Sequence, residues 1–337
     1  MKQYFTLLNL PCESNFKTKI ERAFIPRLNP TPERYAELRH TYEGYCPLLL
    51  ENGYCGLHSA CGAEALPDVC RLYPRSILSN QGNQASCVNS CERTLEMLFE
   101  STNSLAFVPL NLEVQEEPVP SNEILRKHQY QLSIRALCIS LLSNREDRFP
   151  LRLYKVGQVL SSLDKNEQKD WKSYDFQSDL PICQVEKTFA FIQSIALWFV
   201  ERNRSIEEFR QELTQTEADS VMDRYQRKLQ HLYAVVPDHD IFMEKALVNH
   251  LFYRQFPFTY DKLSLTEHYY ALVGLYLFLR YLTMSFMFNR TTIIDYIDVI
   301  ARAFRVIAHT NFEHNMLILL QNEGINDWES IQSVLTF

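Results

Sequence analysis

The segment YYALVGLYLFLRYLTMSFMF, residues 269–288, is an almost unbroken apolar run, and it decides the fold class of the chain. The interruptions are Arg280, Gly274 and a few hydroxyl groups. A helix that is apolar on all sides lies either in a membrane or in a protein core. An arginine at the centre of a membrane-spanning helix costs about 2.5–3.5 kcal/mol. We therefore predict a buried core helix and expect no membrane partner.

Apolar residues at helical spacing continue on both sides of this run. One set consists of Ile134, Leu137, Cys138 and Leu141. Further sets lie in the segments 189–199, 242–252, 293–308 and 312–320. Glycine is almost absent from these segments, and no alternating strand pattern persists. Such helices bury their apolar stripes against one another, so the sequence predicts an all-α helical bundle over residues 121–337.

Polar residues accompany one of these predicted helices. Asp240 is predicted to cap the helix of 242–252, which explains the segment Pro237-Asp238-His239-Asp240 more simply than a metal site does. Within that helix, Asn249 and His250 are candidates for lining a pocket. The alternative is a polar pair whose hydrogen bonds are satisfied inside the helical core.

The N-terminal third has a different composition. Six of the nine cysteines lie between Cys46 and Cys91, and five of the eight glycines lie between Gly44 and Gly82. A small, loop-rich domain of this kind has a thin core and usually needs a metal or disulfides for stability.

The segment 116–120 is charged and punctuated by prolines, which suits a linker. We predict a cysteine-rich metal-binding domain over residues 1–115 and the helical domain over 121–337. The predicted fold class is thus mainly α, with a small loop-rich cysteine-cluster domain ahead of the bundle.

The cellular compartment affects how the cysteines are used. The first residues show neither the apolar core nor the cleavage site of a signal peptide, so a cytoplasmic protein is expected. Disulfides are disfavoured there, and metal binding is the preferred interpretation. Zinc and an iron–sulfur centre both remain open, because thiolates bind either and only Cys87 and Cys91 form a closely spaced pair. Cys138 and Cys183 stand alone in apolar surroundings, as structural thiols do.

Charge and missing motifs exclude several function classes. The formal charge is −7, from 41 acidic and 34 basic residues, so no nucleic-acid partner is expected. The chain contains no C-x₃-C-x₂-C triplet, the usual cluster motif of radical-SAM enzymes. It also contains no G-x-G or G-x-x-x-x-G-K loop, which argues against a Rossmann-type or nucleotide site.

Several blocks of the chain resemble a known family. They are CPLLLENGYC at 46–55, GAEALPDVCRLYPR at 62–75 and SCE at 90–92. The flagellin lysine-N-methylase family carries C-P-x-L-x-x-x-G-x-C, G-x-E-x-L-x-x-x-C-R-x-Y-P-R and S-C-P-E blocks. LVNHLF at 247–252, followed by FPF at 256–258, resembles the family's C-terminal signature. The resemblance spans most of the chain, and the C-R-x-Y-P-R block is its more specific part.

The resemblance implies an activity and its cofactors. Members of the family transfer methyl groups from S-adenosylmethionine to lysine side chains of flagellin, and hold a 4Fe-4S iron–sulfur cluster with cysteines. Carried over by position, Cys46, Cys55, Cys70 and Cys91 fall on the family's cysteines. They are the predicted metal ligands, with zinc as the alternative metal.

Three side chains that follow Cys70 are candidates for contact with the substrate or with S-adenosylmethionine. Arg71 and Arg75 suit an anionic group, such as the cofactor's carboxylate. The alternative is that they bond to backbone carbonyls and offset the thiolate charge. Tyr73 is a candidate for orienting a lysine amine, and the alternative is a packed tyrosine. The sequence assigns no catalytic residue.

The chain also departs from the family pattern. Cys12 is followed by Glu13-Ser14-Asn15-Phe16, where members usually carry C-C-x-G-W, and Glu92 stands where the third block has proline. Cys61 and Cys87 match no family cysteine. The missing C-C-x-G-W pattern favours a second hypothesis, a non-catalytic, metal-stabilised relative that binds a protein partner. A redox iron–sulfur protein is the third hypothesis.

Overall fold

A computed structural model describes residues 1–32, 34–41, 45–78, 84–109, 122–165, 171, 173–203, 206–207, 209–214, 219–258 and 262–337. The chain forms two compact units, Met1–Tyr73 and Pro74–Phe337. The predicted linker at 116–120 lies outside the described residues, so the boundary placed there stays a prediction.

The smaller unit is built from short elements joined by loops. These are α1 (Lys2–Leu8), α2 (Ser14–Ala23), β1 (Phe24–Pro26), β2 (Ala36–Leu38), α3 (Gly56–Cys61), the 3₁₀ turn η1 (Ala63–Ala65) and α4 (Asp68–Leu72). Strands β1 and β2 pair antiparallel, with Phe24 opposite Leu38. Its buried apolar core is small, with members such as Ile20 and Leu57. This agrees with the predicted loop-rich domain with a thin core.

The larger unit is helical after its first residues. It begins with the antiparallel pair β3 (Arg75–Leu78) and β4 (Gln84–Cys87). The helices that follow are α5 (Glu92–Phe99), α6 (Asn122–Ser143), α7 (Phe149–Asp164), α8 (Val185–Arg202), α9 (Phe209–Thr214), α10 (Val221–Val235), α11 (His239–Tyr253), α12 (Leu265–Met287), α13 (Ile293–His309), α14 (Phe312–Asn322) and α15 (Trp328–Val334). The described part of residues 122–337 contains no strand, which confirms the all-α prediction.

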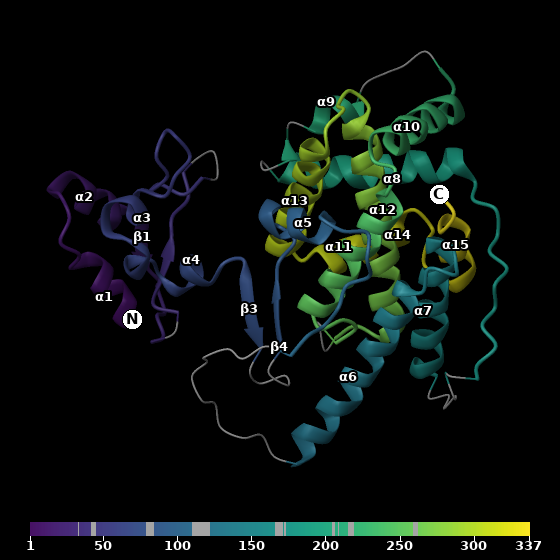
Figure 1. Cartoon of the computed structure of the whole chain (residues 1–337), viewed down its shortest axis with the longest axis horizontal. Helices are drawn as coiled ribbons and strands as arrows, with labels where there is room; N and C mark the ends of the chain where they lie inside the picture. The colour runs from purple at the N-terminus through teal and green to yellow at the C-terminus, as the bar shows by residue number, and fades with distance from the viewer. Residues whose placement is uncertain are drawn as a thin grey trace. The chain divides into compact units, whose positions relative to one another are not determined.

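Helix α12 lies at the centre of the larger unit (Figure 1), where α7, α8, α10, α13 and α14 pack against it. Its start is set by a capping box, in which Ser264 and Glu267 each bond the other's backbone N–H. Among the described residues it is the one helix long and apolar enough to cross a membrane, yet 94% of its apolar window is buried by the protein. The predicted buried core helix is thus confirmed.

Two glycines allow neighbouring helices to approach closely. A Cβ atom added at Gly157 of α7 would lie 2.3 Å from the Tyr269 ring of α12. A Cβ atom added at Gly274 of α12 would lie 2.4 Å from Met316 of α14. Glycine lowers helix propensity, so these positions exchange local helix stability for close packing of the central helix.

The start of α11 differs from the prediction. The helix begins at His239 with Asp238 in the N-cap position, so the predicted cap at Asp240 was wrong. The Asp240 carboxylate instead accepts a hydrogen bond from the Tyr233 hydroxyl at 2.7 Å. It also lies 3.8 Å from the guanidinium of Arg280, which is buried in α12. A tertiary contact therefore uses this carboxylate in place of a local cap.

Candidate functional site

Three of the four predicted metal ligands lie in the smaller unit. Cys55 precedes α3 and forms an isolated antiparallel bridge with Leu49. The Cys46 carbonyl accepts the backbone N–H of Leu49 at 3.0 Å, and Cys70 lies in α4. Burial raises the pKa of the Cys70 thiol, and the neighbouring Cys46 and Cys55 raise it further. The three thiols are therefore near enough to interact electrostatically.

Two further cysteines of the smaller unit pair with each other. The thiols of Cys12 and Cys61 are hydrogen bonded. Burial, and then the charge of Cys12, raises the pKa of Cys61. Cys61, which matches no family cysteine, thus has a specific sulfur neighbour.

The fourth predicted ligand lies in the larger unit. Cys91 is the N-cap residue of α5, and Cys87 ends β4 directly opposite Arg75 of β3. Burial raises the pKa of Cys87, while the charge of Arg75 lowers it and that of Cys91 raises it. Cys87 and Cys91 therefore form a second sulfur pair beside a cation.

All nine cysteines are free thiols, which are donors that zinc and iron–sulfur clusters both accept. Across the ranges that the structure describes, no three His, Cys, Asp or Glu side chains converge as one set of metal ligands. The donor chemistry fits a metal centre, and the joint ligation of one centre by Cys46, Cys55, Cys70 and Cys91 stays a prediction.

The residues after Cys70 divide between the two units. Arg71 forms an exposed ion pair with Asp68 at 2.7 Å, and Tyr73 is half exposed at the end of α4. Arg75 belongs to β3 of the larger unit, beside Cys87. Contact of these side chains with a substrate or cofactor stays a prediction.

Asn249 of α11 joins that helix to the segment from β4 to α5. Its amide nitrogen donates to the Cys87 carbonyl at 2.8 Å and to the Asn89 side chain at 2.6 Å. Its oxygen accepts from the Ser86 hydroxyl at 2.8 Å. Its hydrogen bonds are satisfied, so the interpretation as a core polar group holds for Asn249. The family-like segment 247–252 thus helps to position the Cys87 backbone.

His250 lines a small cavity with Arg254, His268 and Glu313. The cavity holds about 20 Å³, which is room for about one water molecule. Burial, and then the charge of Arg254, lowers the pKa of His250 to about 3. The imidazole is therefore neutral at physiological pH, in a space too small for an organic ligand.

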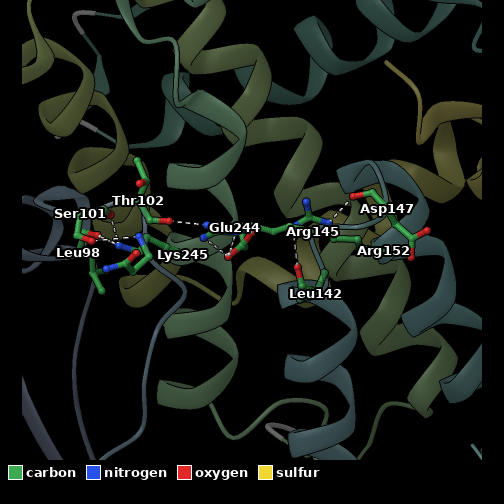
Figure 2. A network of polar contacts seen from close by, with 10 residues as sticks. Leu98, Ser101, Thr102, Leu142, Arg145, Asp147, Arg152, Glu244 and Lys245 are labelled. Carbon is green, nitrogen blue, oxygen red and sulfur yellow. Dashed lines mark hydrogen bonds and ion pairs between the residues drawn. The ribbon is translucent and has the colours of Figure 1, made fainter. Parts of the chain in front are cut away.

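A buried polar network holds three helices of the larger unit together. Glu244 of α11 is 1% exposed. Its carboxylate accepts from Arg145 at 2.7 Å and from Arg152 of α7 at 2.6 Å (Figure 2). Arg145, which follows α6, also donates to the Thr102 carbonyl, and Arg152 donates to the Leu142 carbonyl at 3.1 Å. One carboxylate thus ties α6, α7 and α11 to the segment after α5.

Lys245 extends the network toward α5. Its ammonium group donates to the carbonyl of Leu98 at 2.6 Å and to that of Ser101 (Figure 2). Burial lowers the pKa of Lys245, the charge of Arg145 lowers it further, and Glu244 raises it. These contacts fix the end of α5 and the loop that follows it.

A cleft of about 480 Å³ opens beside this network, between β4, the segment after α5, α6 and the end of α11. Arg135 of α6 lines it and is 4% exposed. The guanidinium donates to the side-chain oxygens of Gln84 and Gln255, and lies 4.8 Å from the centre of the Phe252 ring. A buried cation therefore faces a cleft with mainly apolar walls.

A comparison with known protein families matches residues 135–334 to the FliB lysine N-methylase C-terminal domain. The match covers more than half of the chain. The chain belongs to the FliB lysine N-methylase family. Neither the curated proteins nor the solved structures include a significant match to it. The family predicted from the sequence is therefore confirmed, and the match includes the segment 247–258, whereas the cysteine blocks at 46–92 precede it.

The matched FliB domain contains Arg135, Glu244 and Asn249, whereas the four predicted cysteine ligands precede it. Sequence reasoning missed both Arg135 and Glu244. One signal was present for Arg135: it lies in an apolar helical run with no acidic residue within four positions on either side. No comparable local signal marked Glu244.

Proposed function

We propose that this FliB family member is an S-adenosylmethionine-dependent protein-lysine N-methyltransferase and that its substrate is flagellin. The match of residues 135–334 to the lysine N-methylase domain carries the proposal. The sequence blocks around Cys46–Cys55 and Cys70–Arg75 support it, because they resemble the same family.

The reaction sets requirements that the chain has to meet. The neutral lysine amine attacks the methyl carbon, the carbon–sulfur bond breaks, and the methylated ammonium ion releases a proton to solvent. S-adenosylmethionine supplies the methyl group. The protein has to align the amine with the methyl carbon and lower the lysine pKa by desolvation. A cleft walled by aromatic and aliphatic side chains provides such an environment.

We further propose that Cys46, Cys55, Cys70 and Cys91 hold a 4Fe-4S cluster, with zinc as the alternative metal. The effect of Cys46 and Cys55 on the Cys70 thiol supports three of these ligands. Holding the N-terminal region together would be a sufficient role for the cluster. We propose a cytoplasmic location, where nine free thiols stay reduced.

The test is methyl transfer by the full chain. Anaerobically purified protein is incubated with S-adenosylmethionine carrying a labelled methyl group and with purified flagellin. Label on flagellin lysines, located by peptide mass spectrometry, is the expected result. An unrelated lysine-rich protein and a reaction without enzyme serve as controls.

Binding of S-adenosylmethionine without transfer to flagellin would point to another protein substrate. Neither binding nor transfer, with the protein folded and metal-loaded, would contradict the enzyme proposal. It would favour the non-catalytic, metal-stabilised relative that the missing C-C-x-G-W pattern suggests.

A further inference from the structure

The cleft beside Arg135 has the size of a small-molecule site. Its volume of about 480 Å³ lies within the range of roughly 300–1,000 Å³ that such sites occupy. All of its lining residues belong to the larger unit. The Glu244 network joins the end of α5, the end of α6 and the first half of α11, so buried ion pairs hold together the helices that carry the cleft.

Arg135 differs from the other buried arginines of the larger unit. Arg152 pairs with Glu244, and Arg280 lies 3.8 Å from Asp240. Among the described residues, no carboxylate pairs with Arg135, and its guanidinium contacts two amide oxygens and an aromatic ring. Burial lowers its pKa to about 10, so it is still protonated at neutral pH. A buried cation without a counter-ion is unfavourable and calls for an anion.

The amide partners hold the guanidinium in place without neutralising it. Gln84 starts β4, and Gln255 follows α11. The backbone of Gln255 lies in the left-handed region, at φ 58°. A residue other than glycine rarely adopts this conformation, and such residues gather at functional sites. The conformation here accompanies the contact between the Gln255 side chain and Arg135.

The rest of the cleft selects for an apolar, planar group. Phe252 stacks on Phe107 with ring centroids 4.6 Å apart, and both rings line the cleft. Leu132 and Ile139 add aliphatic wall, and Ser140 adds a hydroxyl. The ligand therefore has one anionic group, a flat apolar part and some polar atoms. A nucleoside phosphate suits it poorly, because two or more negative charges would meet a single cation.

We propose that this cleft binds S-adenosylmethionine, with its carboxylate held by Arg135 and its adenine ring against the apolar walls. The inference rests on the proposed methyltransferase function. The cofactor has a single carboxylate, which matches Arg135, a cation that pairs with no carboxylate among the described residues. The ammonium group beside that carboxylate would take the Ser140 and Ser143 hydroxyls of the cleft as acceptors. Its sulfonium cation suits a cleft lined by aromatic faces. Arg135 would then be a binding residue, with no part in the methyl transfer itself.

The first test compares two ligands that differ in the carboxylate. S-adenosylhomocysteine carries the amino-acid end, whereas 5′-methylthioadenosine lacks it. Calorimetric titration of the full chain should show S-adenosylhomocysteine bound about ten- to hundredfold more tightly, as one charge-assisted contact implies. Arg135→Met should remove that difference and leave binding of 5′-methylthioadenosine within about twofold. The melting temperature of the ligand-free variant should not fall, because a desolvated, unpaired charge is removed.

The second test leaves Arg135 in place. Ala136 is an exposed α6 residue that lines the cleft, so Ala136→Trp should fill the cleft without disturbing the core. It should weaken binding of both ligands at least tenfold. Ser133→Trp, at an exposed α6 position outside the cleft lining, is the matched control and should bind both ligands as the wild type does.

The outcomes separate the two proposals. Wild-type binding of S-adenosylhomocysteine that survives both Arg135→Met and Ala136→Trp would overturn the cleft assignment and leave the methyltransferase proposal standing. A loss of both ligands in Arg135→Met, with a lowered melting temperature, would assign Arg135 a structural role and overturn its carboxylate contact. No binding of either ligand by the wild type would overturn the inference together with the function on which it rests.

Discussion

Arg152 of α7 donates to the Glu244 carboxylate of α11 across 2.6 Å, and both side chains are buried. Arg145 takes the other carboxylate oxygen at 2.7 Å. A buried carboxylate that pairs with two cations contributes more to stability than a surface ion pair does. Without it, each cation would be desolvated and would lack a counter-charge. Through Arg145, which follows α6, the Glu244 carboxylate also links the helix that carries Arg135 to α11, the helix that carries Phe252.

Glu244→Gln should strongly destabilise the larger unit. The amide is close to isosteric with the carboxylate, so the change removes charge rather than volume. Arg145 and Arg152 would lose their counter-charge while staying partly or wholly buried, at a cost of about 3–5 kcal/mol. Urea denaturation followed by far-UV circular dichroism measures the change.

Glu96→Gln is the control for that prediction. Glu96 pairs with Arg93 at 2.7 Å, but the two side chains are 44% and 67% exposed. Its loss should change the unfolding free energy by less than about 1 kcal/mol. Equal effects of the two substitutions would contradict the role assigned to the buried network.

Gly157→Ala should lower stability although alanine favours helices. The gain in helix propensity is at most about 1 kcal/mol. The new Cβ would lie 2.3 Å from the Tyr269 ring, and such overpacking costs about 1–3 kcal/mol. A lower melting temperature is the expected result. In a Tyr269→Leu background the ring atoms are gone, and the same substitution should be neutral or stabilising. A loss of stability that is unchanged in that background would rule out the steric explanation.

The part of the fold predicted from the sequence is the part encoded locally. The apolar run at 269–288 is too long and too uniformly apolar to be anything but a spanning or core helix, and Arg280 indicated the core. Asp240 shows where local rules fail. A carboxylate just ahead of an apolar helical run fits a cap, but its tertiary partners Tyr233 and Arg280 determine its position.

The candidate site depends on contacts between distant segments. Arg135 meets Gln84 from 51 positions away and Gln255 from 120 positions away. Sequence spacing carries no information on such pairs, so the cleft was not predicted. The cysteine blocks were found because each is contiguous in the sequence. Only the resemblance to the family selected four of the cysteines as ligands.

Acidification should destabilise the larger unit through two imidazoles. Burial and Arg254 lower the pKa of His250 to about 3, and burial and Arg280 hold that of His239 well below its usual range. Unfolding restores an ordinary pKa of about 6.5, so the unfolded state binds more protons below that value. Stability is therefore full above about pH 6.5 and falls as the pH drops toward about 3, by up to about 1.4 kcal/mol per pH unit for each imidazole.

Urea midpoints between about pH 7.5 and about pH 5.5 measure this dependence. His250→Gln should reduce the slope, because glutamine does not titrate and the contribution of His239 remains. His314→Gln, at an exposed position of α14, is the matched control and should leave the slope as it is in the wild type. A slope unchanged by His250→Gln would contradict the neutral state of that side chain.

Cys70→Ala should remove the metal centre, whereas Cys183→Ala should retain it. Cys70 lies beside Cys46 and Cys55, so its loss takes away one of the proposed thiolate ligands. Cys183 is buried in the larger unit, with its sulfur 3.1 Å from the Thr188 hydroxyl, and serves as a structural thiol. Iron, sulfide and zinc are measured on anaerobically purified chains.

About four irons and four sulfides per wild-type chain, lost in Cys70→Ala and kept in Cys183→Ala, would support the cluster. About one zinc with the same dependence on Cys70 would replace the cluster by a structural zinc site. A metal content that both variants share with the wild type would exclude Cys70 as a ligand.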